Sequence, residues 1–153
     1  MKIFICIILL LSSFIFAYKR EQYFLSRLSA NNLFKELANK LRENSYTSIK
    51  PVFEVINAVL KSDGIVYDDN IEYHEIINIF KEYTKNAFGA AAFTDALLEF
   101  NNATLSDVDE RCQELNKIAE KNYENALAEY EKCKNTVFWV YPGIAAMIAL
   151  LII

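Results

Sequence analysis

The chain has 153 residues, a length that suits one domain, and 54% of them are hydrophobic. Only three glycines and two prolines are available for tight turns, which disfavours an all-β fold or a phosphate-binding loop. The formal charge is −4, from 16 basic and 20 acidic residues, and no basic cluster appears. Because nucleic-acid binding needs a clustered basic surface, we expect a helical protein with no nucleic-acid partner.

Residues 1–17 have the order of a secretory signal peptide. Lys2 precedes an apolar stretch from Ile3 to Leu11, and small residues lead to Ala17. The stretch is short for a comfortable membrane crossing. We predict cleavage before Tyr18, which delivers the chain to an oxidising compartment, and the alternative is an uncleaved anchor.

Three amphipathic helices are predicted next, over residues 20–43, 48–62 and 69–85, with a possible break of the first at Asn31-Asn32. Ser48 would cap the second helix, Gly64 would end it, and Asp69 with Glu72 would form a capping box for the third. Their apolar residues recur at steps of three and four, so they share one face of each helix. These residues are Phe24, Leu28, Phe34, Leu37, Ala38 and Leu41; Val52, Phe53, Ile56, Val59 and Leu60; and Tyr73, Ile76, Ile77, Phe80 and Tyr83.

Residues 86–100 form a small, apolar segment in which Gly89 and Ala90 to Ala92 would let another helix approach closely. We expect a tightly packed helix; Asp95 and Glu99 argue against membrane insertion. A final helix begins after Thr104 or Ser106 and has no glycine or proline before Pro142. We therefore expect it to continue unbroken toward the C-terminus.

The last 18 residues, 136–153, carry no charge and nearly match the thickness of a hydrocarbon core. Trp139 and Tyr141 suit the headgroup zone, which favours a transmembrane helix. However, Lys132 and Lys134 would lie on the lumenal side, and no basic residue follows the apolar stretch. A processed glycolipid-anchor signal is the alternative, with its attachment site near residues 125–128.

Cys112 and Cys133 would remain after loss of Cys6 with the signal peptide. They lie 21 residues apart on one predicted helix, about 31 Å of rise, so they cannot form a disulfide with each other. Together with Ala119 and Ala126 they repeat every seven residues. Two interpretations remain open: buried small side chains within one chain, or a parallel homodimer with like-to-like disulfides at Cys112 and Cys133.

Asn102-Ala103-Thr104 is an N-glycosylation sequon in a predicted connection between helices. The expected passage through the secretory pathway would make Asn102 available for glycosylation.

Residues suited to catalysis or metal binding are sparse. The only histidine is His74, and His74-Glu75 lacks the second histidine of a zinc-binding helix. Asp63-Gly64 resembles the turn of a calcium loop, but Val59 and Asn70 fall where carboxylates are required. We therefore expect no enzyme, no metal site and no cofactor.

Together these features predict an all-α bundle of about four helices, the last one long and leading into a C-terminal hydrophobic helix. The expected organisation is a signal peptide over 1–17, an extracellular helical domain over 18–135 and a transmembrane helix or glycolipid-anchor signal over 136–153. The expected function is binding, to an unknown protein or apolar ligand, by a membrane-anchored protein of the secretory pathway or cell surface. The alternative is a secreted carrier of an apolar ligand.

Overall fold

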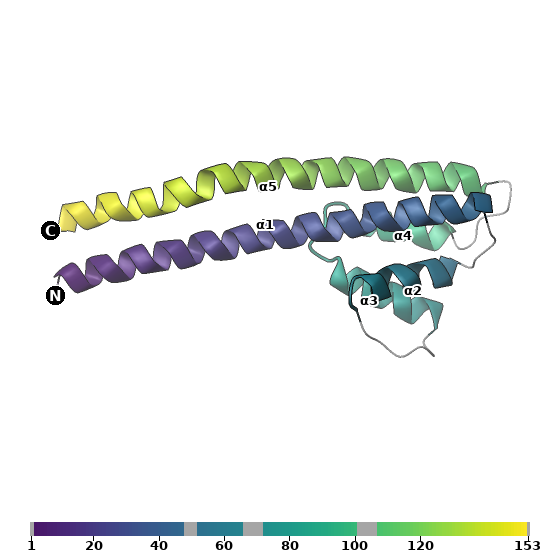
Figure 1. The fold of residues 1–153 in the computed structure, drawn as a ribbon, viewed down its shortest axis with the longest axis horizontal. Coiled ribbons are helices and arrows are strands. Elements are labelled where there is room, and N and C mark those ends of the chain that lie inside the picture. The colour runs from purple at the N-terminus through teal and green to yellow at the C-terminus, as the bar shows by residue number, and fades with distance from the viewer. Residues whose placement is uncertain (1, 48–51, 66–71, 101–106, 153) are drawn as a thin grey trace. The chain divides into compact units, whose positions relative to one another are not determined.

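The computed structural model describes residues 2–47, 52–65, 72–100 and 107–152 (Figure 1). Five helices make up almost all of this part of the chain, and it contains no strand, which confirms the predicted all-α class. They are α1 (Lys2–Thr47), α2 (Val52–Ser62), α3 (Tyr73–Tyr83), α4 (Ala90–Phe100) and α5 (Val108–Ile152).

The chain divides into two compact units. The helical domain is Arg27–Ala126, and the paired-helix unit joins Met1–Ser26 with Leu127–Ile153. The predicted cleavage point after Ala17 lies inside α1, which continues through it without a break.

The helix α1 does not end at Asn31-Asn32, so the expected break is wrong. Instead of capping a helix end, the Asn31 side chain donates from Nδ2 to the carbonyl oxygen of Arg27, one turn earlier, at 2.9 Å. Asn31 is fully buried, as are Phe34, Leu37 and Ala38 on the predicted apolar face. The intrahelical bond keeps the asparagine compatible with the helix.

Gly64 ends α2, as predicted. Its φ of 79° lies in the left-handed region that glycine adopts most readily. The amide of Gly64 donates to the Lys61 carbonyl at 3.1 Å, and the amide of Ile65 donates to the Leu60 carbonyl at 3.0 Å. This pair of bonds is the Schellman motif, and Ile65 completes it by packing against the core. Asp63 and Gly64 therefore close a helix; the predicted Ser48 cap lies outside the described residues.

The helix α3 begins one turn later than predicted. Glu72 is its N-cap residue and forms a capping box with Glu75, whose side chain accepts from the Glu72 amide at 3.2 Å. The expected cap, Asp69, lies outside the described residues. Ile76, Ile77 and Phe80 are buried as predicted, but the Tyr83 side chain, 47% exposed, is not part of the core.

The helix α4 approaches α5 closely at Gly89. A Cβ atom at Gly89 would collide with Nδ2 of Asn122 on α5. Gly89 therefore leaves room for a side chain of α5, but Ala91 and Ala92 are exposed and take no part in the predicted close approach of a second helix. The buried face of α4 is formed instead by Phe93 and Leu97, which lie one helical turn apart.

Three aromatic rings from three helices form the centre of the helical domain. Phe34 of α1 stacks on Phe93 of α4, with ring centroids 4.2 Å apart and planes 9° apart. Phe80 of α3 packs against both rings, with centroids at 5.6 and 6.3 Å. Helix α5 contributes Cys112, Leu115 and Ala119 to the same core. Large rings held in contact bury much apolar area, so this cluster is expected to dominate the stability of the domain.

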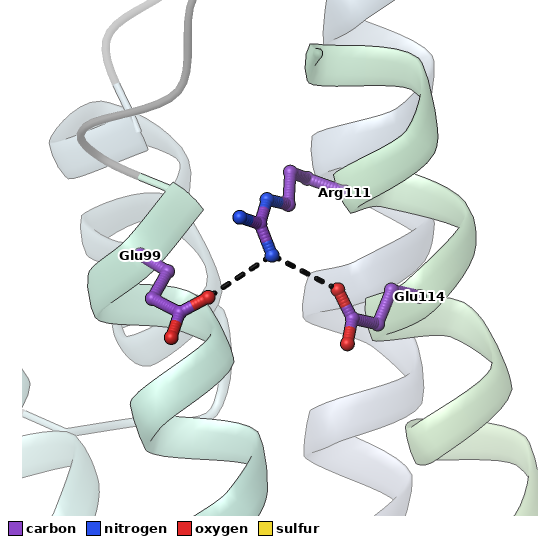
Figure 2. A network of polar contacts seen from close by, with 3 residues as sticks. All are labelled: Glu99, Arg111 and Glu114. Carbon is purple, nitrogen blue, oxygen red and sulfur yellow. Dashed lines mark hydrogen bonds and ion pairs between the residues drawn. The ribbon is translucent and has the colours of Figure 1, made fainter.

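Arg111 of α5 joins α4 to α5 on the surface of the helical domain. Its Nη1 lies 3.0 Å from Oε2 of Glu99 and 3.2 Å from Oε2 of Glu114 (Figure 2). All three side chains are more than a third exposed, so water and salt weaken the attraction. The network orients α4 and α5 but contributes little to stability.

The two left-handed glycines provide a matched test of the close approach. Gly64→Ala should cost about 1–2 kcal/mol from backbone strain alone, because nothing lies within 4 Å of the added Cβ. Gly89→Ala should cost slightly more, since the added Cβ must also displace the amide at the end of the flexible Asn122 side chain. Adding Asn122→Ala should return the cost to the level of Gly64→Ala, measured by chemical unfolding in detergent followed by circular dichroism. Equal costs for the two glycine variants would contradict the close contact.

Candidate functional site

The paired-helix unit brings the two apolar ends of the chain together in antiparallel orientation, with the start of α1 beside the end of α5 (Figure 1). Its small core is formed by Ala17, Cys133 and Val137, with Phe24 and Tyr141 packed against them. Nearer the ends, Cys6, Ala145 and Ala149 are buried, and the Cys6 Sγ atom lies 3.6 Å from the Ala149 carbonyl oxygen. Small side chains at this contact let the two helices approach closely, as they do between membrane helices.

The outer surface of the same unit is apolar. Exposed fractions reach 81% for Trp139 and 88% for Leu151. Large apolar side chains are also exposed along the first part of α1; they are Ile3, Phe4, Ile5, Ile7, Ile8, Leu11, Phe14, Ile15 and Phe16. In the part of the chain that the structure describes, two helices are long and apolar enough to cross a membrane, a property that core helices and signal sequences share. A soluble monomer rarely exposes so continuous an apolar surface, and such surfaces are typical of sites that contact a membrane or another protein.

A hollow of about 350 Å³ lies between α1 and α5 where the apolar stretches meet the charged part of the unit. We call it the arginine notch. Its lining passes from polar to apolar along α5, with Glu129 and Lys132 at one end and Val140 and Tyr141 at the other. The full lining is Arg20, Phe24, Glu129, Lys132, Cys133, Thr136, Val137, Val140 and Tyr141.

Arg20 is held in the notch by aromatic side chains. Its guanidinium Nη1 donates to the Tyr141 hydroxyl, and its Cζ atom lies 5.7 Å from the Tyr141 ring centroid and 5.9 Å from that of Phe24. Phe16 contacts the Tyr141 ring edge-on, with centroids 5.2 Å apart. Cation–π contacts and a hydrogen bond restrict the guanidinium without neutralising its charge.

Cys112 and Cys133, for which burial within one chain and a seam between two chains were both open, are buried within this chain. Cys112 is 0% exposed in the core of the helical domain, and Cys133 is 7% exposed in the core of the paired-helix unit. Partial burial, opposed by nearby Arg20, raises the pKa of the Cys133 thiol, so the protonated form predominates at neutral pH. The interchain disulfide at Cys112 and Cys133 stays a prediction, and forming it would require the small-residue face to leave its present contacts.

A second, open hollow of about 600 Å³ lies in the helical domain, lined by Ile65, Asn78, Ile79, Glu82 and Tyr83. At its edge the Tyr83 hydroxyl donates to Oδ2 of Asp63 at 2.9 Å. This hydrogen bond, with burial and the negative charge of Asp63, raises the pKa of Tyr83 because it favours the neutral phenol. The walls are mainly apolar and the rim is polar, which suits a small amphipathic molecule.

The remaining candidate residues do not converge. His74 is largely exposed, and its Nδ1 lies 3.2 Å from Oε2 of Glu72, on the surface of α3. Within the four described ranges, no three His, Cys, Asp or Glu side chains are grouped as metal ligands would be. The sequon residue Asn102 lies outside the described residues.

Sequence reasoning missed the pairing of Arg20 with Tyr141. No role was predicted for Arg20 from the sequence, and Tyr141 was placed only in the headgroup zone. Their contact joins residues 121 positions apart, and helical periodicity carries no information about which helices pair. The one available signal was that the charge boundaries, Lys19-Arg20 and Lys134, flank two apolar stretches of similar length.

Burial of the cysteines predicts how they react. In the folded protein extracted from membranes under mild conditions, Cys112 should react with a thiol reagent only after unfolding, since its side chain is inaccessible to the reagent. Mass spectrometry before and after denaturation measures this, with Cys133→Ser as the control that leaves Cys112 in place. A disulfide-linked dimer on non-reducing electrophoresis that is lost in Cys112→Ser would contradict it and support the interchain seam.

Comparisons with protein-family models, curated proteins and solved structures give no match to this chain. Any function must therefore be argued from its own residues. The two features that chemistry singles out are the apolar surface of the paired-helix unit and the arginine notch beside it.

Proposed function

We propose that the chain is an exported, membrane-anchored helical protein that acts by binding through its helical domain, rather than by catalysis. The observation that carries the proposal is the apolar surface of residues 136–152. Trp139, Met147, Leu150 and Leu151 are each more than half exposed there, and no charged residue interrupts the segment. Transfer of one such side chain from water to an apolar medium is favourable by about 1.5–3 kcal/mol, so several together favour insertion into a bilayer.

The helical domain is suited to present a surface to a partner. Its core is filled by packed aromatic and aliphatic side chains, so its shape is maintained without a ligand. Rigid, preformed surfaces bind with a low cost in ordering. The partner is a protein or a molecule with an apolar part, met at an extracytoplasmic membrane or at the cell surface.

The open hollow beside Ile79 and Tyr83 favours a second candidate function, transport of an apolar ligand. A carrier should retain lipid through purification, and its thermal stability should rise when the lipid is restored, because the ligand binds only the folded state. Pull-down with the tagged full-length protein from its own host, compared with a Tyr83→Ala variant, separates a protein partner from a ligand held in this hollow.

Charged substitutions test the anchor and export together. Ile144→Lys/Ile148→Lys puts two charges on an exposed face of the apolar segment, at a cost of about 2.5–3.5 kcal/mol for each lysine near the bilayer centre. We expect this variant to be released from membranes, while Gln113→Lys/Asn125→Lys, with the same charges on exposed positions of the helical domain, stays bound.

The N-terminus of the same membrane-bound material should begin near Tyr18. If the mature chain retains Met1, the export proposal fails in its cleaved form, since residues 2–17 then remain as a second apolar helix. Membrane attachment of the lysine pair variant with a cleaved N-terminus would contradict anchoring by residues 136–152.

Glycosylation reports the side of the membrane on which the helical domain lies. In a host that attaches N-glycans, wild-type protein should gain mobility after enzymatic deglycosylation, and Asn102→Gln and Thr104→Ala should not. Asn101→Gln preserves the sequon Asn102-Ala103-Thr104 and should behave as wild type. An unmodified wild-type protein from such a host would count against an extracytoplasmic domain.

A further inference from the structure

We propose that the arginine notch binds the phosphate-bearing headgroup of an anionic membrane lipid. The inference rests on the proposed membrane attachment and names a ligand for it. Arg20, Phe24 and all the α5 residues of the lining follow the predicted cleavage point, so cleavage leaves every lining residue in the chain. It would remove Phe16 and Ala17, which pack against Tyr141 and in the core with Cys133.

The notch lies at the depth of the lipid headgroups. Tyr141 belongs to the uncharged segment of α5, and helical side chains lean toward the N-terminus of their helix, so its hydroxyl points back toward the charged boundary. Trp139 is exposed in the same turn. Tryptophan and tyrosine concentrate at the headgroup level of a bilayer, and the guanidinium that contacts the Tyr141 hydroxyl therefore reaches that level.

The lining of the notch has a net positive charge. The lining contains two cations, Arg20 and Lys132, and one carboxylate, Glu129. Among the residues that the structure describes, neither cation forms an ion pair. The Arg20 guanidinium is exposed to an incoming ligand and is held against two aromatic rings, and its planar donors match phosphate oxygens.

The size and lining of the notch suit a lipid headgroup. The volume of about 350 Å³ is at the small end of ligand pockets, enough for a headgroup and not for a whole lipid. Val137 and Val140 continue the lining toward the exposed apolar surface, where acyl chains would lie. Basic pockets between membrane helices bind anionic headgroups in this way.

The single tryptophan gives a direct measurement. Trp139 is 81% exposed and adjoins Val140 of the notch, so a lipid bound there lies close to the indole. Full-length protein is reconstituted in phosphatidylcholine vesicles that contain either brominated phosphatidylglycerol or brominated phosphatidylcholine. We expect the anionic lipid to quench Trp139 fluorescence at a mole fraction at least about five-fold lower, the effect of one cation near a charged surface.

Two charge-matched variants separate the notch from general attraction to an anionic surface. Arg20→Gln/Lys132→Gln should abolish the preference, whereas Lys19→Gln/Lys134→Gln removes the same charge from neighbouring exposed positions and should retain most of it. Arg20→Lys keeps the charge without the planar stacking and should have an intermediate preference. Circular dichroism of each variant in the same vesicles checks that the helices persist.

Each outcome has a defined meaning. The proposed lipid binding by the notch is overturned if both double variants lose the preference for anionic lipid equally. It is also overturned if the two lipids quench the wild type equally. If millimolar inorganic phosphate removes the preference, the site binds free phosphate and the lipid assignment is overturned. No quenching by either lipid means that the chain does not enter the bilayer, and the anchoring proposal fails with it; quenching by both without preference leaves anchoring intact.

Discussion

Close packing of α1 against α5 through small side chains is the interaction on which the paired-helix unit, and with it the arginine notch, depends. In the paired-helix unit the contact is made by alanine and cysteine, with Ala17 completely buried. In the helical domain, Cys112 and Ala119 present the same narrow face of α5 to a core that contains residues of α1. Small side chains therefore let the two helices approach in the paired-helix unit, whereas in the helical domain the rings of Phe34, Phe80 and Phe93 fill the core.

Much of this architecture could be predicted because helical periodicity is a local property. Faces such as Ile56, Val59 and Leu60 are buried as expected, and Gly64 ends α2 because a left-handed residue was needed there. The predictions were wrong where the local preference of a residue did not decide its place in the fold. The bond from Asn31 to the Arg27 carbonyl made the asparagine compatible with α1, and Tyr83 found a hydrogen-bond acceptor outside the core. The pairing of Arg20 with Tyr141 could not be predicted from the sequence, because it depends on which helices pack against each other.

The chemistry of the chain is divided between its two units. The helical domain offers a packed interior, an exposed histidine and one open hollow with a polar rim. The paired-helix unit offers an extensive apolar surface that ends at a restrained guanidinium. The proposed function would use the two units separately: a non-directional, hydrophobic attachment by the paired-helix unit, and recognition through the shape of the helical domain.

The buried amide of Asn31 has a consequence for the stability of the helical domain. Its Oδ1 atom is enclosed without a hydrogen-bond partner in the described part of the chain. An unsatisfied buried acceptor costs about 1–3 kcal/mol, a considerable part of the roughly 5–15 kcal/mol that keeps a typical domain folded. The domain therefore tolerates a local defect inside its first helix. A neighbouring residue or bound molecule that supplied one N–H group to this oxygen would tighten the fold without any gain in buried area.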